Sequence, residues 1–396
     1  MKSVVCVGRN DLKIISVKDS LLPARKPNHH LVRVTYSGIN PTDWKHLHEG
    51  SQYYTATRAN KNNHVQLGCE GYGEILEPND NTCNVFKKGA KVYFLLGKGY
   101  GQTNSGSLTE IINVHVNHVA IAPSKLSPKE SAVTPLTLLT AYQSLRDAGY
   151  DKPNCGEGQS ILIHAGAGGV GHMAIQLCSN VYNFSRIVCT CSQDNIEFVK
   201  KLGCTDVVNY KVEDFVEKYD GNKFDVVLDT VGGEPTFFYG LCASRSKISK
   251  YLERSRIVTK RGGKVIGILT GSTLYGGPCG LFGSMLCSFI PGLLYQLIVR
   301  NIFCGRCQPQ YVGPYFLPSN KNMKSVSKDL AALAKFIDDG MVAPCVTKEY
   351  KLHEIETAIN HLKYQGGHTG GLDYSSSNTG EKKSFRGKIV INLMND

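Results

Sequence analysis

Short apolar runs in the first 125 residues alternate with polar positions, which is the period of half-buried β-strands. Residues that favour turns, such as those at 77–80, separate the runs. The clearest apolar positions are Leu31, Val32, Val34 and Tyr36 in one run, and Val92, Phe94 and Leu96 in another. This pattern predicts a β-rich N-terminal domain.

A helix is predicted directly after this domain. Ser127-Pro-Lys-Glu130 has the form of a capping box, with proline at the first helical position. We expect one helix that runs from there to about Gly149.

From Gln159 onward, short buried runs alternate with stretches of helical periodicity. Ile196, Val199 and Leu202 recur at helical spacing, and Gly203 follows them as a stop signal. The strand-like runs are 161–163, 187–190, 224–228 and 265–269. Strands that alternate with helices indicate a parallel sheet, so we predict an α/β, doubly wound domain here.

The C-terminal part adds an amphipathic helix and a last strand. Leu330, Leu333, Ala334 and Ile337 form the apolar face of the helix, which Gly340 ends, and the strand covers 388–393. Residues 366–385 are rich in Gly, Ser, Thr and Asn, and are interpreted as a mobile insertion.

The composition is that of a globular protein with more than one domain. The chain has 396 residues, 41% hydrophobic and 20% charged, with a net charge of +12. The basic residues are scattered without a run of five or six like charges, so we expect no nucleic-acid partner. A site for an anionic cofactor is compatible with the positive charge.

Cysteine usage indicates reduced thiols and no metal. The 14 cysteines are irregularly spaced, and several lie in apolar stretches, which favours an intracellular protein without a disulfide framework. Cys304 and Cys307 form a lone CxxC, and a structural zinc site needs a second pair nearby.

The sequence predicts neither a membrane span nor a targeting signal. Strand-like sequence begins almost at once and no leader is visible, so we expect a cytoplasmic chain unless a presequence has been removed. Residues 281–299 carry no charge, but Pro291 and Gly292 interrupt them. We expect a buried helix-turn-helix there at a subunit interface or pocket wall, with membrane contact possible, but no membrane span.

A glycine fingerprint follows the strand at 161–163. In Gly166-Ala-Gly-Gly-Val-Gly171, Gly166 would make the tight turn and Gly168 would let the backbone approach a pyrophosphate. Gly171 would allow close packing of helix on strand, with the phosphates at the helix N-terminus. The pattern therefore predicts a dinucleotide site.

The end of the second strand bears on the choice of dinucleotide. An acidic residue there would hold the ribose 2′-hydroxyl of NAD, but the chain has Cys191 and Ser192, with Asp194 two residues later. A hydroxyl can hydrogen-bond a 2′-phosphate, so we expect NADPH.

Several motifs together resemble the medium-chain dehydrogenase/reductase superfamily, and within it the zinc-free quinone oxidoreductase branch. The pieces 191–194, 206–210 and 367–368 are similar to the reticulon-4-interacting protein type of that branch. The superfamily motifs, besides the fingerprint, are Ser37-Gly-Ile-Asn-Pro-Thr-Asp-Trp-Lys45, Leu67-Gly-Cys-Glu-Gly71, Gly106-Ser-Leu-Thr-Glu110, Asp225-Val-Val-Leu-Asp-Thr-Val-Gly-Gly233 and Arg386-Gly-Lys-Ile-Val-Ile391.

The resemblance implies a domain plan. A GroES-like domain would comprise residues 1–125, completed by 341–396, and a Rossmann domain would comprise 126–340, with the active site in the cleft. It also implies a homodimer, and a mitochondrial location as the alternative to the cytoplasm.

The resemblance also assigns residues to the cofactor. Ala167, Gly169 and Val170 would meet the pyrophosphate. Ser192 and Tyr210 would meet the adenosine end with its 2′-phosphate. Leu269 would lie near the nicotinamide.

The implied reaction is hydride transfer from NADPH to a quinone or an α,β-unsaturated carbonyl compound. Tyr53, or Tyr54 beside it, is the candidate proton donor. Asn40 is the second candidate catalytic residue, although Asn40 and Asp43 are more readily interpreted as shaping the pocket by fixing the turn at Pro41.

The alternative function is a cofactor-binding but non-catalytic interaction or membrane-peripheral protein.

A zinc alcohol dehydrogenase is the third possibility, and the ligand positions argue against it. Zinc members of the superfamily carry Cys where this chain has Asn40, and His–Glu where it has Cys69–Glu70. Catalytic zinc normally has three protein ligands, so we expect no functional metal.

Overall fold

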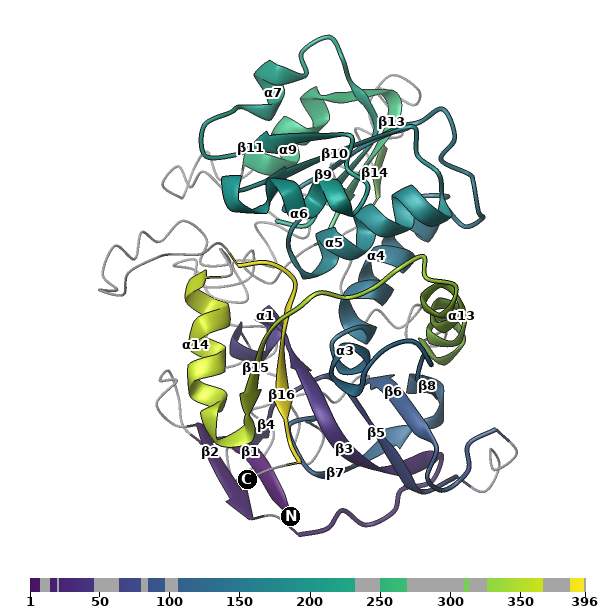
Figure 1. The fold of residues 1–396 in the computed structure, drawn as a ribbon, viewed down its shortest axis with the longest axis vertical. Coiled ribbons are helices and arrows are strands. Elements are labelled where there is room, and N and C mark those ends of the chain that lie inside the picture. The colour runs from purple at the N-terminus through teal and green to yellow at the C-terminus, as the bar shows by residue number, and fades with distance from the viewer. Residues whose placement is uncertain are drawn as a thin grey trace, which may run out of the picture. The chain divides into compact units, whose positions relative to one another are not determined.

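The computed structural model describes residues 1–7, 15–19, 21–45, 64–79, 85–96, 106–231, 250–268, 310–312, 326–365 and 385–394. These residues form two compact units (Figure 1). The first comprises 1–140, 317–363 and 386–396, and the second comprises 141–316 and 364–385. Several predicted features lie outside the described residues. They are Tyr53, Leu269, the apolar segment 281–299, the CxxC pair and most of the insertion at 366–385.

The first unit is built on a mixed sheet with the strand order β15-β16-β3-β5-β6-β8, with β7 pairing to β3. A smaller sheet has the order β2-β1-β4. The strands are β1 (Lys2–Val7), β2 (Ile15–Asp19), β3 (His29–Ile39), β4 (His64–Gln66), β5 (Glu70–Glu77), β6 (Lys91–Leu95), β7 (Ile111–His115), β8 (Val119–Ile121), β15 (Val346–Lys351) and β16 (Lys388–Asn392). The predicted β-rich fold is confirmed.

The last strand of the chain lies beside one of the first. β16 pairs antiparallel with β3, and the register places Ile389 opposite Ile39. This pairing brings Lys388, at the start of β16, next to Asn40, at the end of β3. On its other side β3 pairs with β5, where Gly38 lies opposite Glu70.

Helices complete the first unit. They include α1 (Pro41–Lys45), α3 (Pro128–Ala132), α13 (Val326–Asp338) and α14 (Ile355–Gln365), with the 3₁₀ turns η3 (Val116–His118) and η10 (Leu352–Glu354). The Ser127–Glu130 capping box is present at the start of α3. The helix predicted from there to about Gly149 is in fact two helices, α3 and α4 (Pro135–Asp147). Pro135 explains the break, because it cannot donate a helical hydrogen bond and disfavours helical geometry in the preceding residue. The boundary between the two units falls inside α4, after Thr140.

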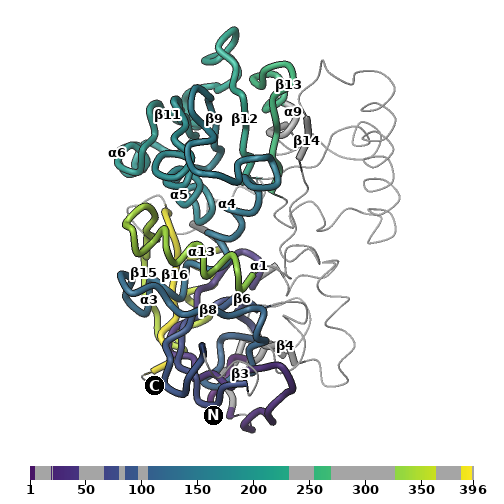
Figure 2. The backbone as a smooth tube through the Cα atoms, turned by 90° about the vertical axis from the view of Figure 1, so that its right-hand side faces the viewer, coloured from purple at the N-terminus to yellow at the C-terminus, as the bar shows by residue number. Residues whose placement is uncertain are grey.

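The second unit contains the predicted parallel sheet, with the order β11-β10-β9-β12-β13-β14. All five pairings between neighbouring strands are parallel. The strands are β9 (Ser160–Ile163), β10 (Arg186–Cys191), β11 (Asp206–Asn209), β12 (Phe224–Asp229), β13 (Thr259–Gly267) and β14 (Gln310–Val312). Figure 2 shows β9, β12 and β13 side by side. The strand predicted at 265–269 begins earlier, at Thr259, and ends at Gly267.

The helical segments of this unit include α5 (Gly169–Gln176), α6 (Ile196–Lys201), α7 (Phe215–Lys218) and α9 (Lys250–Ile257), with the π-helical segment η4 (Leu177–Val181) and the short 3₁₀ helix η5 (Gln193–Asn195). Each of the central strands buries both faces, as parallel strands between helices do: all four residues of β9 are buried. Within the described ranges, no helix is long and apolar enough to cross a membrane.

Candidate functional site

The glycine fingerprint occupies the turn between β9 and α5, which is the context that the dinucleotide-binding interpretation requires. A Cβ atom on Gly171 would lie 2.3 Å from the carbonyl oxygen of Ala165 and 2.8 Å from the Cα of Gly166. These are backbone atoms that cannot move aside, so glycine is needed at 171 for the helix to pack against the strand end. A Cβ on Gly166 would meet the side chain of Cys189 at 2.6 Å.

The N-terminus of α5 is left open for an acceptor. Gly168 is the N-cap residue and supplies no side-chain hydrogen bond to the helix. The first backbone N–H groups of a helix have no partner within it, and the helix dipole favours negative charge there. The backbone N–H of Gly168 already donates to the carbonyl oxygen of Ala165 over 2.9 Å. Those of Gly169 and Val170, in the first turn of the helix, can therefore be offered to a phosphate group.

Buried polar contacts hold this turn in place. The backbone N–H of Ala165, which has a positive φ of 51°, donates to Thr190 Oγ1 over 3.0 Å. Thr230 Oγ1 donates to the carbonyl oxygen of His164 over 2.6 Å. The ring of His164 contacts Ser255 Oγ at 3.0 Å, and burial lowers the pKa of this histidine to about 3. His164 is therefore neutral, and its role in the turn is structural.

The edge of the sheet beside this turn carries the two residues expected at the adenosine end. β10 and β11 are neighbours, and Cys191 pairs with Asn209. Ser192 and Tyr210, which each follow directly, consequently lie at the same edge. Ser192 is buried, whereas Tyr210 is 51% exposed. Burial, followed by the nearby Cys191, raises the pKa of the Tyr210 phenol, which keeps it a hydrogen-bond donor.

Sequence reasoning did not identify Asn195, which contacts Ser192 directly. The Nδ2 atom of Asn195 donates to Ser192 Oγ over 3.2 Å and to the carbonyl oxygen of Phe385 over 3.3 Å. Its position three residues after the strand-end serine is a signal that could have revealed it.

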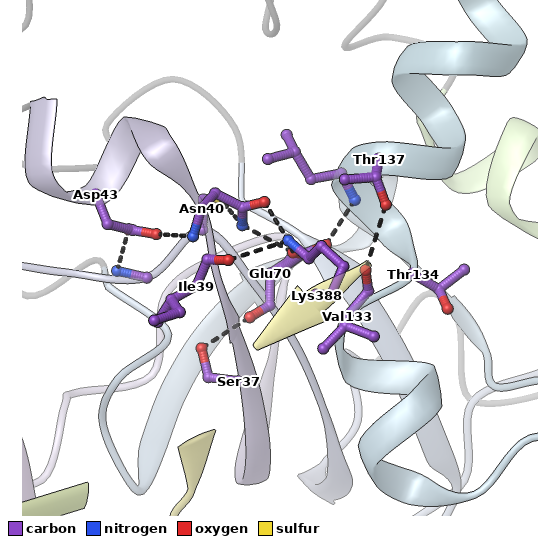
Figure 3. Close-up of polar contacts among 12 residues, drawn as sticks. Ser37, Ile39, Asn40, Asp43, Glu70, Val133, Thr134, Thr137 and Lys388 are labelled. Atoms are coloured by element: carbon purple, nitrogen blue, oxygen red, sulfur yellow. Dashed lines mark hydrogen bonds and ion pairs between the residues drawn. The ribbon is translucent and has the colours of Figure 1, made fainter. Parts of the chain in front are cut away.

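A second polar cluster lies in the first unit, where β3, β5 and β16 meet (Figure 3). Asn40 is at its centre. Its Nδ2 donates to Glu70 Oε1 over 2.8 Å and approaches Cys69 Sγ at 3.7 Å. Its Oδ1 accepts a hydrogen bond from Lys388 Nζ. Both ends of the Asn40 amide are thus engaged inside the protein.

Glu70 is buried and its charge is fully compensated. Oε1 accepts from Lys388 Nζ over 2.8 Å as well as from Asn40. Oε2 accepts from the backbone N–H of Leu136 over 2.7 Å, at the positive end of the α4 dipole. Lys388 was noted in the sequence as part of a motif but not as a site residue. Its ion pair with the buried Glu70 makes it part of this cluster.

Asp43 fixes the turn that precedes α1. Its Oδ2 accepts from the backbone N–H of Asn40 over 2.7 Å and its Oδ1 from that of Gly68 over 3.0 Å. This geometry matches the turn-fixing interpretation of Asp43. Both buried carboxylates of the cluster are satisfied by donors from the protein, so neither is arranged to transfer a proton.

The cluster contains Asn40, Cys69 and Glu70, the positions to which the resemblance noted in the sequence would assign zinc ligands. In the described part of the chain, no group of three or more His, Cys, Asp or Glu side chains is arranged to hold a metal ion. Burial, then the nearby carboxylates of Asp43 and Glu70, raises the pKa of the Cys69 thiol well above its ordinary value. A protonated thiol and a lysine-paired glutamate are poor zinc ligands.

Comparison with known proteins agrees with the fold. The chain is 31% identical to a 2-methylene-furan-3-one reductase of Solanum lycopersicum over 63% of its length and 57% of that protein. It is 27% identical to the mitochondrial NAD(P)H oxidoreductase RTN4IP1 of Danio rerio, over 98% of this chain and 90% of that protein. The structure of a quinone oxidoreductase from Coxiella burnetii superposes with a TM-score of 0.71 at 22% identity, covering 99% of each chain.

Two protein families match directly. Residues 26–124 match the alcohol dehydrogenase GroES-like domain, and residues 202–371 match the zinc-binding dehydrogenase family. Together they cover more than half of the chain, in the order that the motifs at 37–45, 67–71 and 225–233 indicate. The GroES-like and Rossmann folds expected from the sequence are therefore confirmed, and the chain belongs to the medium-chain dehydrogenase/reductase superfamily.

Proposed function

We propose that this protein is a zinc-independent, NADPH-dependent oxidoreductase that reduces a quinone or an α,β-unsaturated carbonyl compound. The proposal is carried by one edge of the parallel sheet. The fingerprint turn and the open N-terminus of α5 follow β9, and Ser192 follows the neighbouring strand β10. This arrangement suits a dinucleotide with an anionic group on its ribose. The names of the similar reductase, NAD(P)H oxidoreductase and quinone oxidoreductase support the reaction class.

The proposed division of labour follows from these contacts. NADPH supplies the hydride when bound. The backbone around Gly168, with Ala167, Gly169 and Val170, binds the pyrophosphate, and Ser192 and Tyr210 bind the 2′-phosphate. Leu269 beside the nicotinamide and Tyr53 as proton donor remain proposals from the family resemblance.

Zinc independence is supported by the cluster around Asn40. The ammonium group of Lys388 provides a fixed positive charge beside Glu70, so the cluster needs no metal ion to neutralise that carboxylate. Asn40, whose amide is fully engaged, acts in this proposal by shaping the substrate pocket. It does not exchange a proton with the substrate.

The reaction is tested with purified, chelator-washed protein. NADPH oxidation is followed against a panel of quinones, enones and enals, alongside a fluorescence titration of NADPH binding. Turnover with at least one acceptor, unchanged by added zinc, is the expected result. Tight NADPH binding without turnover on the whole panel would favour the non-catalytic alternative, and loss of turnover on chelation would contradict zinc independence.

Two further proposals concern assembly and compartment. We infer a homodimer from the family resemblance, which light scattering of the purified protein tests.

A mitochondrial location is supported by the similarity to the mitochondrial oxidoreductase of Danio rerio. Fractionation of cells that express the natural gene tests it.

A further inference from the structure

We propose that Asn195 determines cofactor specificity by fixing the direction of the hydrogen bonds made by Ser192. The inference rests on the proposed NADPH site and goes beyond it, because Asn195 would act on the 2′-phosphate only through Ser192. It is therefore a positioning residue.

The orientation of the Asn195 amide is set by Phe385. A backbone carbonyl can only accept hydrogen bonds, so the atom that lies 3.3 Å from the Phe385 oxygen must be the NH₂ group. The same nitrogen lies 3.2 Å from Ser192 Oγ. Turning the amide over would place two carbonyl oxygens against each other. Both protons of the NH₂ group are thus committed, one to Phe385 and one to Ser192.

The side chain of Asn195 is also held in position. It is 3% exposed, and its backbone N–H donates to the carbonyl oxygen of Ser192 over 3.0 Å, which closes the short turn η5. The distance between the amide and the serine hydroxyl is therefore set by a local turn and not by a long flexible side chain.

Ser192 is left as a donor. One lone pair of its hydroxyl oxygen accepts from Asn195, and among the described residues no acceptor takes its own proton. The serine does not cap the adjacent turn with its side chain either. The hydroxyl proton is consequently available to a bound ligand.

This polarity favours a phosphate over a hydroxyl. A 2′-phosphate has only acceptor oxygens and carries up to two negative charges, so a donor directed at it makes a charge-assisted hydrogen bond. A ribose 2′-hydroxyl gains less, since NAD-selective sites accept from that hydroxyl with a carboxylate. The structure thus links a buried asparagine to the choice between the two cofactors.

The test uses adenosine 2′,5′-bisphosphate and 5′-AMP, which differ at the 2′-position, and measures their dissociation constants by calorimetry. The wild-type protein is compared with Asn195→Asp and Asn195→Leu, each with Ser192 intact and in the Ser192→Ala background. A carboxylate at 195 accepts the serine proton and turns the hydroxyl away from the ligand, and leucine removes the fixed donor. The alanine background measures the direct effect of the added charge, so the coupling between the two positions isolates the polarity effect.

With Ser192 intact, Asn195→Asp should lower the preference for the bisphosphate by about tenfold more than it does in the Ser192→Ala background. Asn195→Leu should lower that preference by a smaller factor. Affinity for 5′-AMP is the internal control for folding and should change little. Equal losses in both backgrounds would overturn the inference while leaving the NADPH site standing. A wild-type protein that binds the two nucleotides equally would overturn the proposed NADPH preference, and this inference with it.

Discussion

Lys388 Nζ lies 2.8 Å from Glu70 Oε1, and the two side chains are only 4% and 0% exposed. The pair joins β16 and β5, the two strands that flank β3. Removing two charges from water is costly, and it is tolerated only when every donor and acceptor is satisfied. Here the ammonium group also donates to Ile39 O and Asn40 Oδ1, and the carboxylate also accepts from Asn40 and Leu136.

Removing one partner of this pair should therefore destabilise the protein strongly. Lys388→Met leaves Glu70 buried with an uncompensated charge, and we expect a loss of about 3–5 kcal/mol in the free energy of unfolding. Urea denaturation followed by circular dichroism measures it.

The matched control is Lys91→Met. Lys91, on β6, pairs at 2.6 Å with Glu74, which lies on β5 like Glu70. Both side chains of this pair are substantially exposed. Solvent screens such a pair, so this variant should unfold close to the wild type. If the two variants lost the same stability, burial would not be what makes the Lys388 pair important.

Stability should also fall as the pH is lowered from 7 to 5, in part because of His164. Burial, with a smaller contribution from the charge of Arg254, lowers its pKa from the ordinary 6.5 to about 3 in the folded protein. Between these values the unfolded chain binds a proton that the folded protein does not. The stabilisation is complete above pH 6.5 and is lost progressively as the pH falls toward 3.

His164→Gln removes this titration while keeping a polar side chain. Between pH 7 and pH 5 the wild type should lose about 2 kcal/mol more of its free energy of unfolding than the variant does. Each pH unit below 6.5 contributes about 1.4 kcal/mol to that difference. Urea unfolding at pH 7, 6 and 5 tests this. Parallel pH profiles for the two proteins would show that His164 is protonated in the fold as readily as in the unfolded chain.

Much of the fold could be predicted because its determinants are local. The apolar period of 161–163 and the glycines after it define β9 and α5 without reference to distant residues. The break at Pro135 was missed because the capping signal at Ser127 and the apolar pattern beyond it suggested one continuous helix. A proline at the start of α4 was the local signal that should have divided it.

The site was only partly predictable, since its remaining residues are brought together by tertiary structure. Asn40 and Lys388 are far apart in sequence, and the pairing of β16 with β3 makes them neighbours. The contact of Asn195 with Phe385 joins two segments in a similar way. A polar residue in a short strand motif gives no sequence signal of the partner that it will meet.

The fingerprint glycines should differ in what they contribute. In Gly171→Ala the new Cβ would collide with backbone atoms of Ala165 and Gly166, so we expect about 1–3 kcal/mol of destabilisation or more. In Gly168→Ala the nearest atom is 3.2 Å away and φ is −72°, so the stability should change by less than about 1 kcal/mol.

NADPH binding separates the two variants further. A methyl group at 168 lies where the backbone is proposed to approach the pyrophosphate, so Gly168→Ala should bind NADPH at least about tenfold more weakly despite its intact fold. Thermal unfolding and an NADPH titration, run on the same preparations, test both statements. A Gly168→Ala protein that binds NADPH as tightly as wild type would place the pyrophosphate elsewhere.

We expect NADPH to be preferred over NADH, and Ser192→Asp to reverse or remove that preference. A carboxylate at the end of β10 would accept from a ribose 2′-hydroxyl and repel a 2′-phosphate. The wild-type serine is instead a donor, and Tyr210 lies at the same edge of the sheet with its phenol protonated. Charge-assisted hydrogen bonds contribute about 1.5–3 kcal/mol each, so one of them corresponds to about 10- to 100-fold discrimination.

The dissociation constants of both cofactors, measured in wild type and variant, give the ratio. Asp194 is the competing carboxylate, so Asp194→Asn is the control and should leave the ratio nearly unchanged. A wild-type ratio that favours NADH, together with its loss in Asp194→Asn, would assign the ribose to Asp194 and not to Ser192.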